Sequence, residues 1–209
     1  MQNNADSPSS RASSSPLDET TITVPDLHSI PVLYPHGTRI IWITQNGEIT
    51  VLDRQAIAAE LALGPPLVCH RRWSEARSGV EITSCLDLME LFAFARPARF
   101  CLPTPAGLAA QLSLPRPHSA EDMAAILPKA AFMLLDELAL LEGRAHEEAA
   151  GIAGMMGAGG WMWGPVILAH LGLTAEQPAP PDGMKASIWR RLPEFTDYPP
   201  TIQPGSDPI

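Results

Sequence analysis

The chain has 209 residues, a formal net charge of −9 and 45% hydrophobic residues. This length and apolar content are enough for one ordinary domain with a real core, while the acidity argues against strong non-specific nucleic-acid binding by the whole chain. The 22 prolines cluster near both ends and in the middle, which is typical of tails and element boundaries and excludes a fibrous protein.

The first 24 residues are rich in Ser and contain no apolar run. They therefore lack the features of a secretory signal, and we expect a disordered tail over 1–24.

The three cysteines, Cys69, Cys85 and Cys101, each lie in an apolar run and show no Cys-x-x-Cys spacing. This pattern favours buried thiols in a reducing compartment, here the cytoplasm, over a disulfide or zinc framework.

The first half of the chain predicts strands and one helix. Residues 30–34 and 39–44 are predicted strands, and Asn46–Gly47 predicts a hairpin turn into a third, because both turn residues tolerate a positive φ. Helical spacing follows from Asp53, a suitable N-cap, with Ile57, Ala58 and Leu61 expected on one face. The next predicted strand is 67–70.

The second half is predicted to be mostly helical. A helix is expected at 85–95, where Ser84 and Asp87 match a capping box. A short helix should follow Thr104, with Pro105 in its first turn, and a long one should cover about 119–142, capped by Ser119 and kinked at Pro128. Strands that alternate with helices predict an α/β domain.

No formally charged residue occurs from Ala149 to Ala175. A membrane anchor and a buried helical pair both explain this composition, but the many glycines and Pro165 favour the helical pair, with Gly151, Gly154 and Gly157 allowing close packing. The Gly-rich run 151–160 lacks the Gly-Lys-Ser/Thr ending of a phosphate-binding loop, so no ATP site is expected in this chain.

Several segments resemble known families. RIIWITQNGEITVLD, LVCHRRWSEA and CLDLMELFAFA resemble the hairpin, the second motif and the following helix of DnaQ-type 3′–5′ exonuclease domains. The block from CLDLMELFAFARPARF to LSLP, with GWMWGPVILAHLG and WRRLPEF, resembles the N-terminal region of DinG-like ATP-dependent DNA helicases of alphaproteobacteria, over about residues 28–195.

The resemblance implies a ribonuclease H-like mixed sheet flanked by helices and followed by a helical extension. It divides the chain into a tail (1–24), a degenerate exonuclease-like domain (25–145), a Gly- and Trp-containing extension (146–193) and a linker (194–209). The linker would lead to a helicase core outside this chain, and only that core would bind ATP.

The acids that such a nuclease needs for two metal ions are altered. The first motif falls around Leu33–Pro35, which has no carboxylate. In the second motif, His70 is followed by Glu75 at the expected spacing, but we interpret this Glu as a solvated surface residue. In the third motif, His118 and Asp122 are one residue closer in sequence than the nuclease pattern requires, and we interpret Asp122 as a first-turn helix acid. We therefore predict vestigial residues, no catalysis and no metal site.

The arginines of this region are the better functional candidates. Arg71, Arg72, Arg77, Arg96 and Arg99 interleave with Trp73 and Phe100 and could contact single-stranded DNA. The alternative is a set of surface arginines that pair with Glu75, Glu81 and Glu90.

Three functions follow. The first is a non-catalytic accessory domain of a DNA helicase, with DNA and the motor domains in cis as partners and no membrane association. The second is a weak exonuclease using Mg²⁺ or Mn²⁺ with Glu75, Asp122 and a further acid such as Glu48 or Asp53. The third is a free-standing protein-interaction module.

Overall fold

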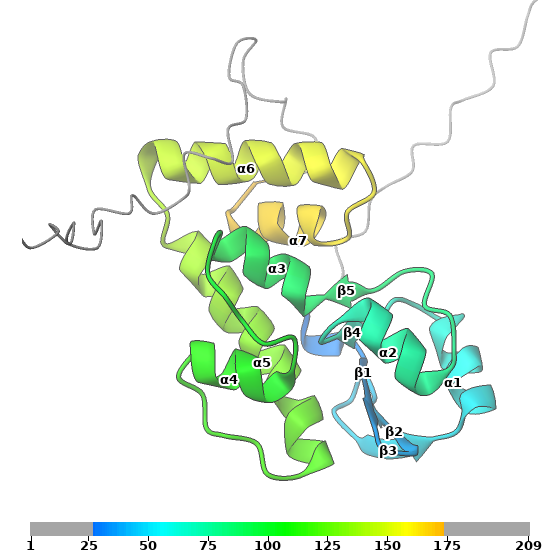
Figure 1. Ribbon diagram of the computed structural model, residues 1–209. Coiled ribbons are helices and arrows are strands. Elements are labelled where there is room, and N and C mark those ends of the chain that lie inside the picture. The colour runs from blue at the N-terminus through cyan, green and yellow to red at the C-terminus, as the bar shows by residue number, and fades with distance from the viewer. Residues whose placement is uncertain (1–26, 174–209) are drawn as a thin grey trace, which may run out of the picture.

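A five-stranded mixed sheet forms the centre of the computed structural model, which describes residues 27–173 (Figure 1). Its strands are β1 (Val32–His36), β2 (Arg39–Ile43), β3 (Ile49–Leu52), β4 (Leu67–Val68) and β5 (Leu86–Asp87). Their order is β3-β2-β1-β4-β5, with β1, β2 and β3 antiparallel and β4 and β5 parallel to β1. The predicted α/β class is confirmed.

The hairpin between β2 and β3 forms where Asn46–Gly47 predicted it. Gly47 has a φ of +80°, and its N–H donates to the carbonyl of Thr44 at 2.9 Å. Because this φ favours glycine, the local sequence alone places the turn.

Helices make up most of the remaining structure. They are the 3₁₀ turn η1 (Leu27–Ser29), α1 (Arg54–Leu61), α2 (Arg71–Ser78), α3 (Leu88–Ala95), α4 (Pro105–Gln111), α5 (Ala120–Ala139), α6 (Gly143–Ala158) and α7 (Trp163–His170). The N-caps predicted at Asp53, Thr104 and Ser119 are confirmed, since each side chain accepts a backbone N–H of the first turn. On α1, Ile57 is buried but Ala58 is exposed, contrary to the prediction.

Two predicted elements are wrong at their boundaries. The helix expected at 85–95 begins only at Leu88, because residues 86–87 pair with β4, so Asp87 is the N-cap itself and Ser84 forms no capping box. The strand expected at 67–70 ends at Val68, since His70 caps α2 by accepting the N–H of Trp73 on Nδ1 at 3.2 Å. Tertiary pairing and side-chain capping override the local propensity in both places.

The two faces of the sheet are covered unequally. On one face, Val32, Tyr34 and Ile41 pack into a large core with side chains of α3, α4, α5, α6 and α7. On the other, Leu33 and Trp42 pack against Ile57 of α1 and the loop before β5. In Figure 1 the sheet stands between α5 and α1, with α6 and α7 beyond α3.

Helices α6 and α7 form the predicted helical pair. Gly157 and Gly164 face each other so closely that a Cβ on Gly164 would lie 2.5 Å from the Gly157 Cα. Trp163 is fully buried in the same core as α3 and α5. Within residues 27–173, no helix has the length and apolar character needed to cross a membrane. The domain boundaries stay a prediction, and residues 174–193 and the linker lie outside the described residues.

Candidate functional site

The three segments that carry the exonuclease-like motifs converge on Tyr34. Its hydroxyl donates to the Met123 Sδ of α5 at 3.1 Å, and its ring stacks on Trp73 of α2 with centroids 5.7 Å apart. The Arg77 guanidinium lies 5.9 Å from the Trp73 ring centroid. We call these four residues, Tyr34, Trp73, Arg77 and Met123, the Tyr34 junction. It brings together β1, α2 and the start of α5.

The chemistry of the Tyr34 junction does not fit a two-metal centre. Tyr34 is 5% exposed, and burial raises its pKa, so the phenol stays neutral at physiological pH. The junction offers a phenol from β1, an indole from α2 and a thioether from α5, whereas hard cations prefer carboxylate ligands. In the described part of the chain, no three His, Cys, Asp or Glu side chains are grouped to hold a metal ion.

Glu75 lies on the same helix as Trp73, but its side chain points away from the Tyr34 junction. Two positions along a helix turn a side chain by about 200°, so Glu75 faces away from Tyr34. Its Oε1 accepts the Ile82 N–H at 3.1 Å and the Arg71 Nε at 3.2 Å, and these bonds hold the pKa of Glu75 below its usual value. Glu75 is therefore not the free surface acid expected, because it ties α2 to the loop before β5.

His118 and Asp122 form the start of α5. The Asp122 carboxylate accepts the N–H groups of His118 at 3.1 Å and Ser119 at 3.0 Å, and these bonds lower its pKa. The Ser119 hydroxyl in turn accepts the Asp122 N–H at 2.9 Å. The interpretation of Asp122 as a helix acid is confirmed. Of the two further acids considered, Glu48 is exposed on the hairpin and Asp53 caps α1.

Asp87 is the acid whose importance the sequence did not reveal. It is 5% exposed, and its carboxylate accepts the N–H groups of Arg71 at 2.8 Å and Met89 at 2.9 Å. Its carbonyl accepts the Trp163 indole N–H at 2.7 Å. Asp87 therefore caps α3, accepts the first N–H of α2, whose N-cap is His70, and anchors α7. The only sequence signal for this burial is its position between two leucines.

The five candidate arginines fall into two groups rather than one surface. Arg71, Arg72 and Arg77 lie on α2, whereas Arg96 and Arg99 follow α3. Arg96 binds both carboxylate oxygens of Glu137, which raises its pKa, and donates to the Gln111 carbonyl. Its partner Glu137 is fourteen residues from Met123 on α5, or about 21 Å along the helix axis at about 1.5 Å per residue. Arg96 therefore binds α5 far from the Tyr34 junction, to which Arg77 belongs.

Two of these arginines are already engaged in structural pairs. Arg71 binds Glu75, and Arg96 binds Glu137 rather than the predicted Glu81 or Glu90. Arg72, Arg77 and Arg99 are exposed, and within residues 27–173 no ion pair holds them. Glu90 instead accepts the Trp161 indole N–H at 2.8 Å. Of these three exposed arginines, Arg77 of α2 lies over an aromatic ring, that of Trp73.

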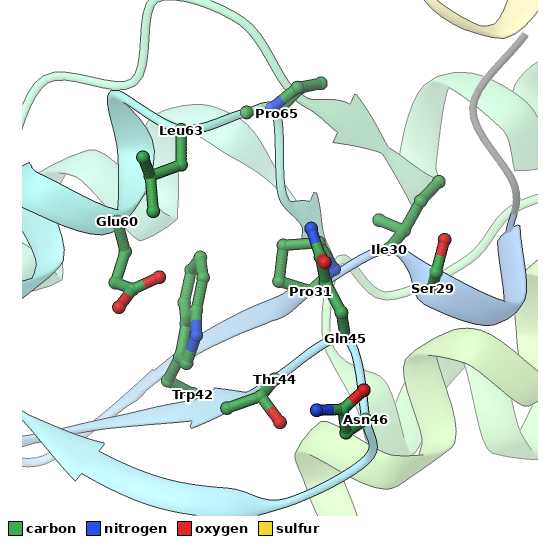
Figure 2. A pocket seen from close by; sticks show the side chains of 11 residues that line it. Ser29, Ile30, Pro31, Trp42, Thr44, Gln45, Asn46, Glu60, Leu63 and Pro65 are labelled. Atoms are coloured by element: carbon green, nitrogen blue, oxygen red, sulfur yellow. The ribbon is translucent and has the colours of Figure 1, made fainter.

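An open cleft lies at the other face of the sheet, where the sequence predicted no site. It has a volume of about 420 Å³ and lies between Ser29–Pro31, the β2–β3 turn and the end of α1 (Figure 2). Figure 2 shows the Trp42 ring standing between Glu60 and Pro31, with Leu63 above it. We call this the Trp42 cleft. Its volume lies within the usual range for ligand sites.

The comparisons with known proteins identify no relative. Protein-family models, curated proteins and solved structures gave no match to this chain. The residues of the chain itself therefore carry the assignment of function.

Proposed function

We propose that this chain is a non-catalytic, exonuclease-like domain of the ribonuclease H-like fold that assists an ATP-dependent DNA helicase. The convergence of β1, α2 and α5 on Tyr34 carries this proposal, because a nuclease of this kind gathers its motifs from the corresponding segments. The five-stranded mixed sheet flanked by helices is compatible with that fold. The helicase assignment comes from the sequence resemblance described above.

The filled junction supports a role without catalysis. Two-metal hydrolysis needs carboxylates that hold two cations a few ångströms apart. At the Tyr34 junction, stacked rings and a thioether fill the volume between β1, α2 and α5. The carboxylates of Glu75 and Asp122 accept hydrogen bonds from backbone N–H groups. We derive no metal-dependent step for this chain.

The exposed side of α2 is the surface we propose for DNA. Arg72 and Arg77 can contact phosphates, and the half-buried Trp73 ring lies next to Arg77. Three buried, free cysteines fit the reducing cytoplasm, where we place the protein.

Catalysis is tested by incubating the purified chain with end-labelled single-stranded DNA and Mn²⁺. We expect no digestion above that of a Glu75→Ala control. Digestion that is lost in Glu75→Ala would instead favour a weak exonuclease.

DNA contact is tested by fluorescence anisotropy with a labelled oligonucleotide over a range of salt. The Arg72→Gln/Arg77→Gln double variant should bind about tenfold more weakly, with a salt slope lower by about 1 to 2, since each phosphate contact releases counterions. Arg99→Gln, which removes one exposed cation from the other group, is the matched control and should bind as the original chain does. Equal binding by all three proteins, or no binding at all, overturns the DNA interface.

The helicase assignment is tested by reading the coding DNA beyond codon 209. An in-frame phosphate-binding motif of the Gly-Lys-Ser/Thr type is expected. A stop codon at that point, with no helicase gene beside it, would contradict the assignment.

A further inference from the structure

One edge of the sheet is open for a further strand. Strand β3 is the last in the strand order, and within residues 27–173 it pairs only with β2 (Figure 1). Sheets usually protect such an edge with a lysine, a proline or a bulge. β3 reads Ile-Thr-Val-Leu, without a charge or a proline, and its register with β2 is continuous. We call residues 48–53 the β3 edge.

The hydrogen-bond pattern between β2 and β3 shows which backbone groups point outward. The Thr44 N–H donates to the Glu48 carbonyl at 2.9 Å, so this pair begins the ladder. Bonded and non-bonded pairs alternate along antiparallel strands, so Thr50, two residues further on, bonds to β2. Ile49 and Val51, on either side of it, form non-bonded pairs. Their N–H and C=O groups therefore point away from β2, and within residues 27–173 no turn, loop or cap bonds them.

The side chains of Ile49 and Val51 extend an apolar row of the sheet. Their partners on β2 are Ile43 and Ile41, and Ile41 is fully buried in the large core that includes α5. Directly paired residues share a face of the sheet, yet Ile49 is 46% and Val51 is 53% exposed. A further strand beside β3 would cover both side chains and remove apolar surface from water.

The charges at the two ends of the β3 edge specify the partner. Glu48 precedes the strand and Asp53 follows it, both are exposed, and no ion pair holds either of them within residues 27–173. The nearest cation in the sequence, Arg54, lies beside α2, because a Cβ on Gly79 would be 2.5 Å from its Nη2. A segment with β-branched residues at its centre and a Lys or Arg at each end therefore complements this edge.

We propose that the β3 edge binds an extended, basic-ended segment of a partner protein, which joins the sheet as an added strand. The antiparallel arrangement is the more stable one per residue. In it, residues i and i+2 of the segment each exchange both backbone hydrogen bonds with Val51 and Ile49. Residues i−2 and i+3 of the segment then face Asp53 and Glu48, which places a cation opposite each acid.

The test uses the end-capped peptide Lys-Thr-Val-Thr-Ile-Lys and the isotope-labelled full chain. Amide hydrogen exchange, measured by NMR, should slow at Ile49 and Val51 when the peptide is added and stay unchanged at Thr50, whose N–H already bonds to β2. A peptide with Glu at both ends should bind about tenfold more weakly, because it places like charges opposite each other. Unchanged exchange at Ile49 and Val51 with millimolar peptide, or equal binding of the two peptides, overturns the proposal.

Two substitutions locate the contact on the protein. Val51→Pro removes an outward N–H at an edge position that tolerates proline, so it should abolish binding. Val51→Thr keeps this N–H and is the matched control. Glu48→Lys leaves the backbone intact and should shift the preference to Lys-Thr-Val-Thr-Ile-Glu, whose Glu faces position 48.

Three results would contradict the proposal. The first is binding that survives Val51→Pro, and the second is an unchanged peptide preference in Glu48→Lys. The third is slowed exchange at Ile49 and Val51 that appears with rising protein concentration and no peptide, since it would assign the β3 edge to a second copy of the chain.

Discussion

The two faces of the sheet each hold a tryptophan, in opposite surroundings. At the Tyr34 junction, Trp73 stacks on Tyr34 and carries Arg77 on its ring, so protein groups fill the space. On the other face, Trp42 lines an open cleft. The segments with exonuclease-like motifs thus meet at the packed Tyr34 junction, whereas no sequence motif marks the residues that line the Trp42 cleft.

The difference follows from how each face is covered. Helix α5 runs along β1 and β2 and delivers Met123 to Tyr34, while α1 is only eight residues long and ends beside Trp42. Five substitutions, three of them paired with a second variant for comparison, test this contrast between a packed face and an open one, from the largest expected effect to the smallest.

Tyr34→Ala should cause the largest loss, because it removes a buried ring that joins β1, α2 and α5. We expect the free energy of unfolding to fall by about 3–4 kcal/mol, measured by chemical denaturation. Tyr34→Phe keeps the ring and loses only a weak bond to sulfur, so it should cost less than about 1 kcal/mol. Similar values for the two variants would show that the junction is not packed.

Asp87→Ala should cost about 2–3 kcal/mol, since it removes a buried carboxylate and leaves the Arg71 N–H without an acceptor, while the Met89 N–H keeps the Cys69 carbonyl at 3.2 Å. Asp53→Ala, which removes an exposed N-cap on the open face, should cost about 1 kcal/mol in the same denaturation experiment. Equal losses would contradict the central role of Asp87.

Gly164→Ala should lower the free energy of unfolding by about 2 kcal/mol, because its Cβ would lie 2.7 Å from the Ala153 carbonyl oxygen. Gly154→Ala on α6 is the matched control. Its Cβ would meet only the Leu168 Cδ1 at 4.0 Å, and the gain in helix propensity should stabilise the protein by about 0.5–1 kcal/mol. A neutral Gly164→Ala would show that α6 and α7 do not pack closely.

Glu75→Gln should cost about 1 kcal/mol at neutral pH. The pKa of Glu75 is lowered from 4.5, so its contribution to stability is present above that pH and is lost as the pH falls through the lower, folded-state value. The difference between Glu75→Gln and the original chain should therefore disappear in acid. A difference that persists at pH 2 would point to packing instead of charge.

Leu63→Ala should change the free energy of unfolding by less than about 0.5 kcal/mol, because the side chain is exposed. A larger loss, measured in the same denaturant, would mean that this side chain is covered and the cleft is filled.

Local chemistry explains which parts of the fold were predictable. The turn at Gly47 and the caps at Asp53, Thr104 and Ser119 depend on residues within a few positions, so the sequence identified them. The β5–α3 boundary was missed because the pairing of Leu86 with Leu67 is a long-range contact. The contact of the Glu75 side chain with the loop before β5 was missed because helix α2, which orients this side chain, was not predicted.

By itself, the sequence determined the α/β class, the starts of α1, α4 and α5, the buried cysteines and the lack of a carboxylate around Leu33–Pro35. Only the tertiary structure decided that Tyr34, Trp73 and Met123 meet, that the arginines divide into two groups, and that Trp42 faces a cleft. Caps and turns are set by hydrogen bonds between neighbours in the sequence. Filled and open spaces depend on how distant elements pack, which a local pattern does not encode.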